Sequence, residues 1–587
     1  MRARGRAFLA TPGDSRGGPT VGTEQVKADP RHARDCAVEI SRRQVLQAGS
    51  LAAAGAAVGQ VMACSEPTGD TTRPGPASAT TAAPRTLMLT GAVTGSGTYL
   101  YLPFAVPAGV SRIDVSMTRS DSDAQLGIGL FDQRGPDYQS AGFRGVFGAE
   151  RSAFFVSAMQ AQQSFLPGPI EAGTWTVVVP VFSVPRPSDV TVKVTMTSEP
   201  QSAAFQPGPQ CGVVVDAPGW YRGDLHCHTP ESSDAWTSGT ALSPAGWAEA
   251  CRRTGLDFIA VTDHNVVSGN LNLARDAGRD VLLMPGEEMT NWAWGHATVS
   301  GIDPGEWLDW RQAPAGKPLP RYGRSISEFI RVAEGMGAYV AAAHPRLLNI
   351  RWQFQQEAEI DPAARCPGFE AWGGVFQADD QLSVQTWDGM LQKGFRVWAN
   401  GGSDLHGVDN NFGLTVGTPT TVVYAEALSK EAVVAGLKAG RMFVTRIPDG
   451  VECYVTARKG DQRTAMGGTI FGGVGDLVEV SFRVRRAGGL DARLHVISAG
   501  NVIEKVPIAS DDQTVTRTVP IPPNGTYVRA EVRSHPHPNP AHPLGSALDM
   551  ECLTNPVWLQ VGDVPPGTQP FDAPPPARPG PRRVSGG

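Results

Sequence analysis

The stretch that decides the fold is Asp224-Leu225-His226-Cys227-His228-Thr229, which ends an apolar, strand-like run. Side chains two positions apart on a strand point to the same face, so His226 and His228 can share one cation. A second run, Asp257-Phe-Ile-Ala-Val-Thr-Asp263-His264-Asn265, carries a carboxylate and an imidazole at its tip. Both stretches indicate strands that present metal ligands at their carboxyl ends.

Three later strand-like runs end in the same kind of side chain. These are Pro285–Thr290 followed by Trp294–His296, then Ala343–Pro345, and then Gly402–His406. Six of the eleven histidines therefore stand at or just after the end of such a run. For any single one, a hydrogen-bonded core histidine is the commoner explanation. Six imidazoles and several carboxylates at one rim, however, would be costly to bury unless bound cations neutralised them, so we predict a metal centre.

The middle of the chain, residues 213–450, alternates strand-like and helical patterns. Amphipathic helical stretches at 244–254, 326–336 and 384–393 lie between several of the apolar runs. This alternation predicts a parallel sheet, either open or closed into a barrel, with ligands at the carboxyl ends of its strands.

The flanking regions show the two-residue periodicity of strands. Residues 86–200 alternate apolar and polar positions between Gly and Pro turns, which predicts an N-terminal β-sandwich of jelly-roll type. Such a module can bind sugars or pack against a catalytic neighbour, and packing is the default expectation. Short strands return in 451–562 as a C-terminal β-module, and the Pro- and Gly-rich tail 563–587 is expected to be disordered.

Composition excludes some classes of function. The 587 residues carry a net charge of −6 without a long basic run, so no general affinity for nucleic acid is expected. In the body of the chain, no stretch of eighteen strongly apolar residues is present to span a bilayer.

Residues 1–64 are predicted to form a leader with an export signal. Ser41-Arg-Arg-Gln-Val-Leu46 resembles a twin-arginine export signal, with Val45 where that pattern prefers Phe. Val61-Met-Ala-Cys64 looks like a lipobox, and 65–85 forms a flexible tether. We expect export to the cell envelope with a lipid anchor at Cys64, or, after ordinary cleavage, release as a secreted protein.

Export permits disulfides, because the compartment is oxidising. Cys453 and Cys552 both fall in the C-terminal module, and we expect them to pair. The mature body contains no C-x-x-C pair, which argues against a thiolate zinc site.

Taken in chain order, the motifs H-x-H, D-H, G-x-E, G-H, H-P and S-D-x-H resemble the polymerase-and-histidinol-phosphatase (PHP) metallohydrolase superfamily over about 220–410. The stretch Glu288–His296, the later Gly440–Arg446 region and the flanking β-modules look more like its carbaryl-hydrolase-like branch. The resemblance implies an α/β fold: a distorted (β/α)7 TIM-like barrel, here flanked by N- and C-terminal β-sandwich modules.

The resemblance also implies two or three divalent metal ions at the rim of the barrel. One would be held by His226, His228, Glu288 and Asp404. Glu288 would bridge to a second ion, held also by His296 and His344. A third site would use Asp234, His264 and His406, with Asp234 where many members carry His. Zinc, manganese and iron all suit such mixed ligands, and Asp263 is expected to orient a ligand imidazole.

These ligands predict an enzyme, a metal-dependent hydrolase of a small-molecule substrate. A metal-bridging hydroxide would attack phosphorus or a carbonyl carbon, and His406 or Asp404 would move protons. Cys227 alternates away from its flanking ligands, so it is not expected to act as a nucleophile.

Three functions stay open. The leading one is a phosphoesterase, with Arg346 either contacting the phosphate or forming an ordinary ion pair. The second is ester or carbamate hydrolysis, with Trp236, Trp292 and Trp294 as aromatic walls or as plain loop packing. The third is a non-catalytic, carbohydrate-binding surface lipoprotein with a structural metal.

Overall fold

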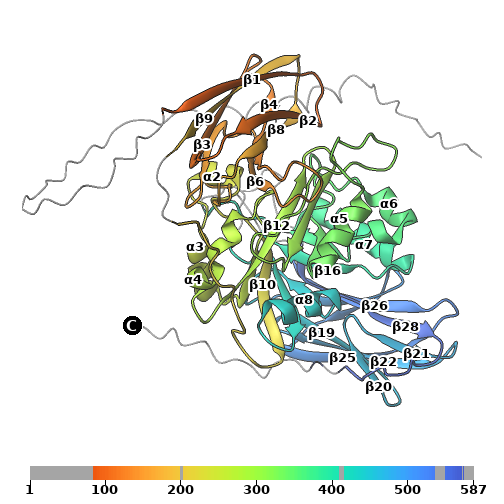
Figure 1. Cartoon of the computed structure of the whole chain (residues 1–587). Coiled ribbons are helices and arrows are strands. Elements are labelled where there is room, and N and C mark those ends of the chain that lie inside the picture. Colours follow the sequence, from red (N-terminus) through yellow and green to blue (C-terminus); the bar gives the residue numbers. More distant parts are fainter. Residues whose placement is uncertain (1–82, 199–202, 409–414, 536–548, 572, 574–587) are drawn as a thin grey trace, which may run out of the picture. The chain divides into compact units, whose positions relative to one another are not determined.

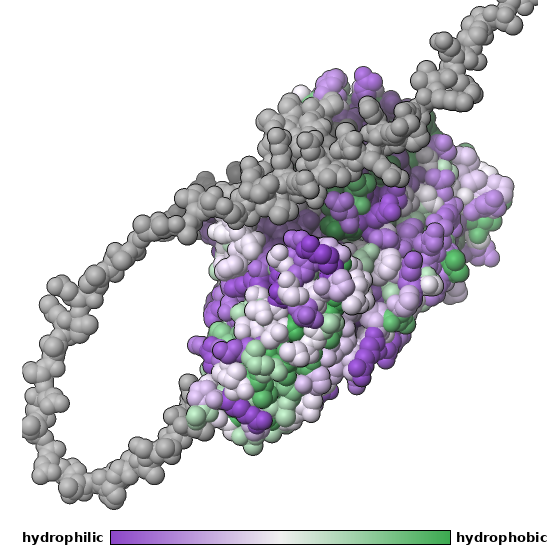
Figure 2. Space-filling view, turned by 90° about the horizontal axis from the view of Figure 1, so that it is seen from above, coloured by the Kyte–Doolittle hydropathy of each residue, from purple (hydrophilic) through white to green (hydrophobic). Residues whose placement is uncertain are grey.

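The computed structural model describes residues 83–198, 203–408, 415–535, 549–571 and 573. The expected export signal and lipobox, and most of the tether and tail, lie outside these residues. Within them, no helix combines the length and the apolar character that crossing a bilayer requires. Polar and apolar residues are interspersed on the face that Figure 2 shows, as is usual for protein surfaces.

Two antiparallel sheets form the N-terminal part of the described chain (Figure 1). The first has the order β1 (Arg85–Val93), β9 (Ser188–Thr197), β3 (Arg112–Arg119), β7 (Ala153–Ser157). The second has the order β2 (Thr98–Val106), β8 (Gly173–Ser183), β5 (Ile128–Phe131), β6 (Phe143–Phe147), with β4 (Gln125–Leu126) also on β8. Alternation along β9 turns Val190, Val192 and Val194 inward, where they share one core with Trp175 of the opposite sheet.

The middle of the chain builds a mixed sheet in which successive strands are mostly neighbours. Its strands are β10 (Gly219–Cys227), β11 (Phe258–Val261), β12 (Leu282–Asn291), β13 (Gly295–Ser300), β14 (Tyr339–Ala342), β15 (Gly368–Gly373) and β16 (Trp398–Gly402). Four neighbouring pairs are parallel, as expected: β10–β11, β11–β12, β14–β15 and β15–β16. The expectation of an all-parallel sheet was wrong at β13, which runs antiparallel to both of its neighbours.

The reason for the antiparallel strand is the short connection before it. Only residues 292–294 join β12 to β13, and Gly295 turns the chain with a φ of 110°. A parallel pair needs a crossover of about a dozen residues or more, so these two strands can only form a hairpin.

Helices lie on both sides of these strands (Figure 1). They are α2 (Ser233–Ser238), α3 (Pro244–Thr254), α4 (Leu273–Ala277), α5 (Ile326–Gly335), α6 (Gln355–Ile360), α7 (Ala378–Gln392) and α8 (Lys430–Lys438), with short 3-10 turns η1 (Ser268–Asn272) and η2 (Pro362–Ala364). The predictions for α3 and α5 are confirmed: Ser243 and Ser325 cap their first turns. The third prediction started too late, because Gln377 and Asp380 form a capping box that begins α7 at Ala378.

The large sheet does not stop at the expected module boundary near residue 450. It continues from β10 through β17 (Thr420–Ala425) and β18 (Met442–Thr445) to β27 (Met550–Thr554), β26 (Thr526–Arg533), β23 (Arg493–Ser498) and β24 (Asn501–Pro507); β28 (Val557–Val561) pairs with β26 and with β21 (Thr469–Gly472). A separate sheet has the order β20 (Gln462–Ala465), β19 (Glu452–Lys459), β22 (Leu477–Arg485), β25 (Asp512–Pro520). Cys453 and Cys552 lie in the shared core as free thiols, so the expected disulfide does not form.

The first and last strands of the middle region meet at one point. Beyond β16, the Asp404 N–H donates to the His226 carbonyl at 2.9 Å, and the His228 N–H donates to the Leu405 carbonyl at 3.2 Å. Among the described strands, however, no continuous ladder closes the sheet into a barrel. The sheet thus curls far enough to bring the carboxyl ends of β10 and β16 to the same ligands.

This close approach needs glycine at Gly402, and we predict that Gly402→Ala destabilises the protein. An added Cβ would lie 2.4 Å from the Cβ of His226, which is well inside contact distance. We expect the free energy of unfolding to fall by about 1–3 kcal/mol, measured by thermal or urea denaturation.

The matched control is Gly389→Ala in α7, where nothing lies within 4 Å of the new methyl group. Alanine favours the helix there, so stability should hold or rise by roughly 0.5–1 kcal/mol. Equal losses in the two variants would contradict the proposed contact between the strand ends.

Candidate metal centre

The nine predicted ligands come from separate elements and lie together at one edge of the sheet. His226 and His228 end β10, Glu288 and His296 lie in β12 and β13, and Asp234 lies in α2; His264, His344, Asp404 and His406 follow the ends of β11, β14 and β16. Three overlapping groups have their ligand atoms within 4.8 Å of one another. They are His226, His228, Glu288 and Asp404; His264, Glu288 and His296; and His228, His264 and His406.

Glu288 is the centre of the cluster, because imidazoles face both of its oxygens. Its Oε1 lies 2.9 Å from His296 Nδ1 and 3.1 Å from His344 Nε2. Its Oε2 lies 2.7 Å from His264 Nδ1 and 3.3 Å from His226 Nε2. A carboxylate shared in this way can bridge two cations.

The distances around Asp404 fit one cation. Its Oδ1 lies 3.2 Å from His226 Nε2 and 3.0 Å from His228 Nε2. Donor atoms that surround a tetrahedral ion at about 2.0–2.1 Å lie roughly 3.3 Å from one another. The spacing of these three side chains therefore matches a coordination shell.

A second triangle of donor atoms has the same dimensions at the outer side of the cluster. Asp234 Oδ2 lies 3.2 Å from His264 Nε2 and 3.3 Å from His406 Nε2. The two ring nitrogens are themselves 3.3 Å apart. The residues that the sequence resemblance implies for a third ion are thus brought together.

At part of the cluster, the electrostatics favour the protonation states that bind metal. Burial, helped by neighbouring imidazoles, lowers the pKa of His228 to about 3, and burial lowers that of His296 to about 4. Burial alone would raise the pKa of Glu288, but the imidazoles around it outweigh this and hold it well below its ordinary value. Neutral imidazoles beside ionised carboxylates are the forms that bind metal.

Two other imidazoles have a raised pKa, which favours their protonated form when no ion is bound. Burial alone would lower the pKa of His226, but Asp404 and Glu288 outweigh it and hold the pKa well above its ordinary value. For His264 too, burial is outweighed, by Glu288 and Asp234. A bound cation would have to displace these protons, so metal affinity should fall as the pH falls.

Several buried polar atoms in the cluster make no hydrogen bond with a described residue. They are Nε2 of His226, Nε2 of His296, Nδ1 of His344 and Oε2 of Glu288. Buried polar atoms seldom lack a partner, since each one costs free energy. Together with the ligand spacing, these atoms show that the residues fit bound divalent ions.

Two ligands have an unusual backbone conformation. His344 has a φ of 26° and Asp404 a φ of 52°, in the region that side chains other than glycine seldom adopt. Such residues cost about 1–3 kcal/mol each and concentrate at functional sites. Here they aim ligands from the ends of β14 and β16 at the cluster.

Glu370, which the sequence analysis missed, orients one ligand. It is buried in β15, its Oε2 lies 3.1 Å from His226 Nδ1, and it accepts a hydrogen bond from the His344 N–H at 3.0 Å. This contact leaves His226 Nε2 to face Asp404 and Glu288. The only sequence signal was one acidic residue within the apolar run Gly368–Gly373.

Asp263 acts on a ligand through one intermediate residue. Its Oδ1 accepts hydrogen bonds from the Thr229 N–H at 2.7 Å and the Ser232 hydroxyl at 3.1 Å. The Ser232 Oγ lies 2.9 Å from His228 Nδ1. The residue thus supports an imidazole without belonging to the ligand groups themselves.

The N-terminal sheets hold the segment that carries Asp234. Glu231 Oε2 accepts a hydrogen bond from the Ser164 N–H at 2.6 Å. Ser233 Oγ accepts one from the Gly148 N–H at 3.0 Å and donates to Glu150 at 2.9 Å. Packing of the N-terminal module against the middle region therefore fixes the start of α2 and, with it, one side of the cluster.

The other predicted residues lie around the cluster in different ways. Arg346 is exposed and makes no hydrogen bond or ion pair with a described residue. Trp292 lies beside the ligands, its ring 5.6 Å from that of His296, whereas Trp236 lies under Arg151, whose guanidinium is 3.9 Å from the ring.

Cys227 points into a separate apolar core with Trp247, as its alternation predicted. Burial raises the pKa of Cys227 well above its ordinary value, so its thiol stays protonated.

Comparisons with known proteins add no relative. No protein-family model matches this chain, and no curated protein matches it. The candidate centre therefore rests on the geometry of the chain's own residues.

We predict that Glu288→Gln abolishes binding at two sites, whereas Asp234→Asn weakens only the outer one. Loss of a residue that only hydrogen-bonds a metal ligand typically lowers metal affinity 10–100-fold. Loss of the charge of Glu288, which would bridge two ions, should lower it by more than about a hundredfold. Equilibrium dialysis against zinc or manganese, followed by elemental analysis, measures the ions per chain.

Glu287→Gln is the matched control. Glu287 is also fully buried, but it faces away from the cluster and accepts a hydrogen bond from the Leu308 N–H. Burial raises its pKa well above the ordinary value, so an uncharged amide resembles its native state. Equal metal content in the Glu288 and Glu287 variants would refute the assignment.

Proposed function

We propose that this chain is a metal-dependent hydrolase of the PHP type, with a middle region that is an open variant of the distorted α/β barrel. The observation that carries the proposal is the convergence of nine predicted ligands in one cluster, with five imidazoles at most 3.5 Å from the Glu288 carboxylate. The order of these ligands along the chain supports the superfamily, and their spacing supports two or three divalent ions.

The balance of charge supports an anionic substrate, and so a phosphoester. When bound, divalent ions would lower the pKa of a coordinated water toward neutrality and polarise an oxygen of the substrate. Three such ions would exceed the combined charge of the three carboxylate ligands, Asp234, Glu288 and Asp404, and of the neighbouring Glu370. The site would then attract a phosphate group without an arginine, which is consistent with the exposed position of Arg346.

The ligand side chains differ in their exposure to solvent. The buried ones can hold ions, and the more exposed ones can exchange protons with water. The side chains of His226, His228 and Glu288 are at most 1% exposed. Those of Asp404 and His406 are 26% and 31% exposed. Hydrolysis forms a bond to a water oxygen, breaks the bond to the leaving oxygen and delivers a proton to it; we assign that proton transfer to the Asp404 and His406 side chains.

Hydrolysis of a neutral ester or carbamate is the second candidate. It is supported by the Trp292 ring beside two ligand imidazoles, 6.0 Å from that of His264 and 5.6 Å from that of His296. The non-catalytic alternative is less well supported, since structural metal sites are closed and single, whereas Asp404 and His406 reach solvent.

We predict that the protein, purified and loaded with zinc, manganese or iron, hydrolyses 4-nitrophenyl phosphate or its bis-ester. Chelation should abolish turnover and metal should restore it, because the activated water depends on the ions. Asp404→Asn should lower kcat by at least about a hundredfold, because Asp404 would both hold an ion and move a proton.

Arg346→Ala serves as the comparison, and we expect its KM for the phosphoester to match that of the native protein. Turnover of a naphthyl carbamate alone would favour the second candidate. Full metal occupancy without turnover of any of these esters would contradict the proposal.

A further inference from the structure

We infer that a cleft between the end of α7 and the C-terminal strands binds one neutral sugar ring, at a site separate from the metal centre. Its walls come from the last turn of α7, from the turn between β23 and β24, and from β26 and β28. The side chains that carry the inference are those of Gln392, Asn524, Thr526, Tyr527, Trp558 and Gln560. None of them belongs to the ligand cluster, so binding here does not depend on the proposed hydrolysis.

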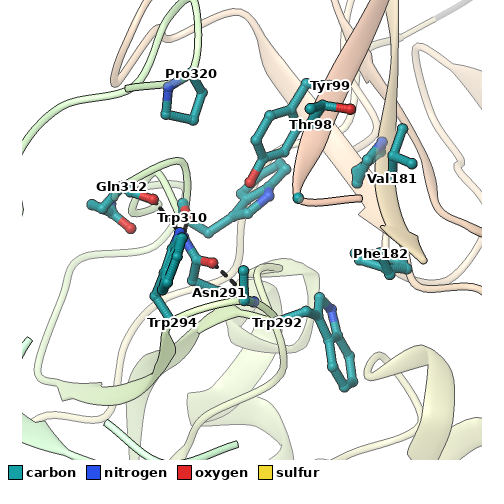
Figure 3. Close-up of a pocket in the computed structure, with 13 residues that line it drawn as sticks. Thr98, Tyr99, Val181, Phe182, Asn291, Trp292, Trp294, Trp310, Gln312 and Pro320 are labelled. Carbon is teal, nitrogen blue, oxygen red and sulfur yellow. Dashed lines mark hydrogen bonds between the residues drawn. The ribbon is translucent and has the colours of Figure 1, made fainter. Parts of the chain in front are cut away.

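Size distinguishes this sugar cleft from the hollow beside Trp292. The hollow, which Figure 3 shows between Tyr99, Phe182 and Trp292, has a volume of about 30 Å³, roughly that of one water, and so holds no larger ligand. The sugar cleft measures about 240 Å³, the space of roughly eight waters. Drug-sized ligands occupy about 300–1,000 Å³, so a somewhat smaller space fits a single small ring.

Two buried aromatic rings form the inner end of the sugar cleft. Trp558 and Tyr527 are 4% and 2% exposed, and their ring centroids are 5.5 Å apart. The Arg396 guanidinium lies over the Trp558 ring at 4.1 Å, and the Tyr527 hydroxyl donates to the Asp388 carbonyl at 3.4 Å. These contacts hold both rings in place. The rings therefore offer a rigid apolar surface against which the C–H groups of a sugar can pack.

Uncharged hydrogen-bonding side chains lie nearer the opening. Gln392 and Asn524 are exposed, and Gln560 is half-buried. In the described part of the chain, the side-chain amides of Asn524 and Gln560 have no hydrogen-bond partner. Gln392 Nε2 donates to Asp388 Oδ2 at 3.2 Å, which leaves its Oε1 free to accept. A carboxamide carries a donor and an acceptor side by side, so it matches neighbouring hydroxyls that each donate and accept.

The absence of charge in the lining excludes ionic ligands. None of the described residues that line the sugar cleft is Asp, Glu, Lys, Arg or His. Behind the lining, the carboxylate of Asp388 is paired with Arg529 at 2.8 Å. An ionic group would lose its hydration without gaining a partner, whereas a neutral polyhydroxyl ring would exchange water for the amides. Small volume, apolar floor and uncharged rim together select a neutral monosaccharide.

The test titrates the full metal-loaded protein with the methyl glycosides of glucose, galactose, mannose and glucuronic acid, followed by saturation-transfer NMR. At least one neutral glycoside should bind with a Kd of about 1–10 mM, since a few neutral hydrogen bonds supply the affinity. The charged glucuronoside should bind at least about threefold more weakly than its glucose counterpart, because the lining holds no cation.

Two variants locate the binding. Gln560→Ala removes one uncharged partner and should raise the Kd about three- to tenfold. Asn524→Trp, at an exposed position of the lining, should fill the sugar cleft and abolish binding. Thermal unfolding checks that both variants fold like the native protein.

The matched control is Gln356→Ala, which removes an exposed carboxamide of α6 outside the sugar cleft. It should bind the glycosides like the native protein. Chelation of the metal should also leave binding unchanged, because no predicted metal ligand lines the cleft.

Three outcomes would overturn the inference. They are no binding of any neutral glycoside, equal affinity in the native protein and both cleft variants, and loss of binding on chelation, which would place the sugar at the metal centre. Binding that depends on Gln560 and persists without metal would support the sugar cleft, whether or not the protein hydrolyses any ester.

Discussion

The interaction on which the rest of the structure depends is the contact of the fully buried Glu288 carboxylate with imidazoles on both of its oxygens. A buried carboxylate is costly unless charged or hydrogen-bonding groups compensate it, and a pair broken on one side would leave an uncompensated charge. Strand ends from β10 to β16 must therefore converge on one point. The positive φ angles of His344 and Asp404 are part of the cost of that convergence.

The fold meets this requirement with a mixed sheet that curls on itself. The hairpin of β12 and β13 places Glu288 and His296 on neighbouring strands, so both contact the same centre. At the other end, Gly402 lets the chain after β16 lie against His226. The N-terminal sheets complete the arrangement by hydrogen bonds to Glu231 and Ser233, which fix the segment that carries Asp234.

Buried and exposed ligands have different roles in this arrangement. On the proposed function, the buried ligands would hold the ions, and the more exposed Asp404 and His406 would connect them with solvent.

Short-range sequence patterns determined part of the fold and of the candidate site. The two-residue spacing of His226 and His228, the recurrence of imidazoles and carboxylates at strand ends, and the serines before α3 and α5 are all recognised within a few residues, so the cluster and these helices were predictable from local pattern. The assignment of individual ligands to ions came from the family resemblance. Tertiary structure alone decided the path of the sheet past residue 450, the role of Glu370 and the free thiols of Cys453 and Cys552. It also decided that Phe182 faces Trp292 across more than a hundred residues of chain. These features depend on contacts between distant segments. The hydrophobic periodicity of one segment does not specify which distant segment it will contact.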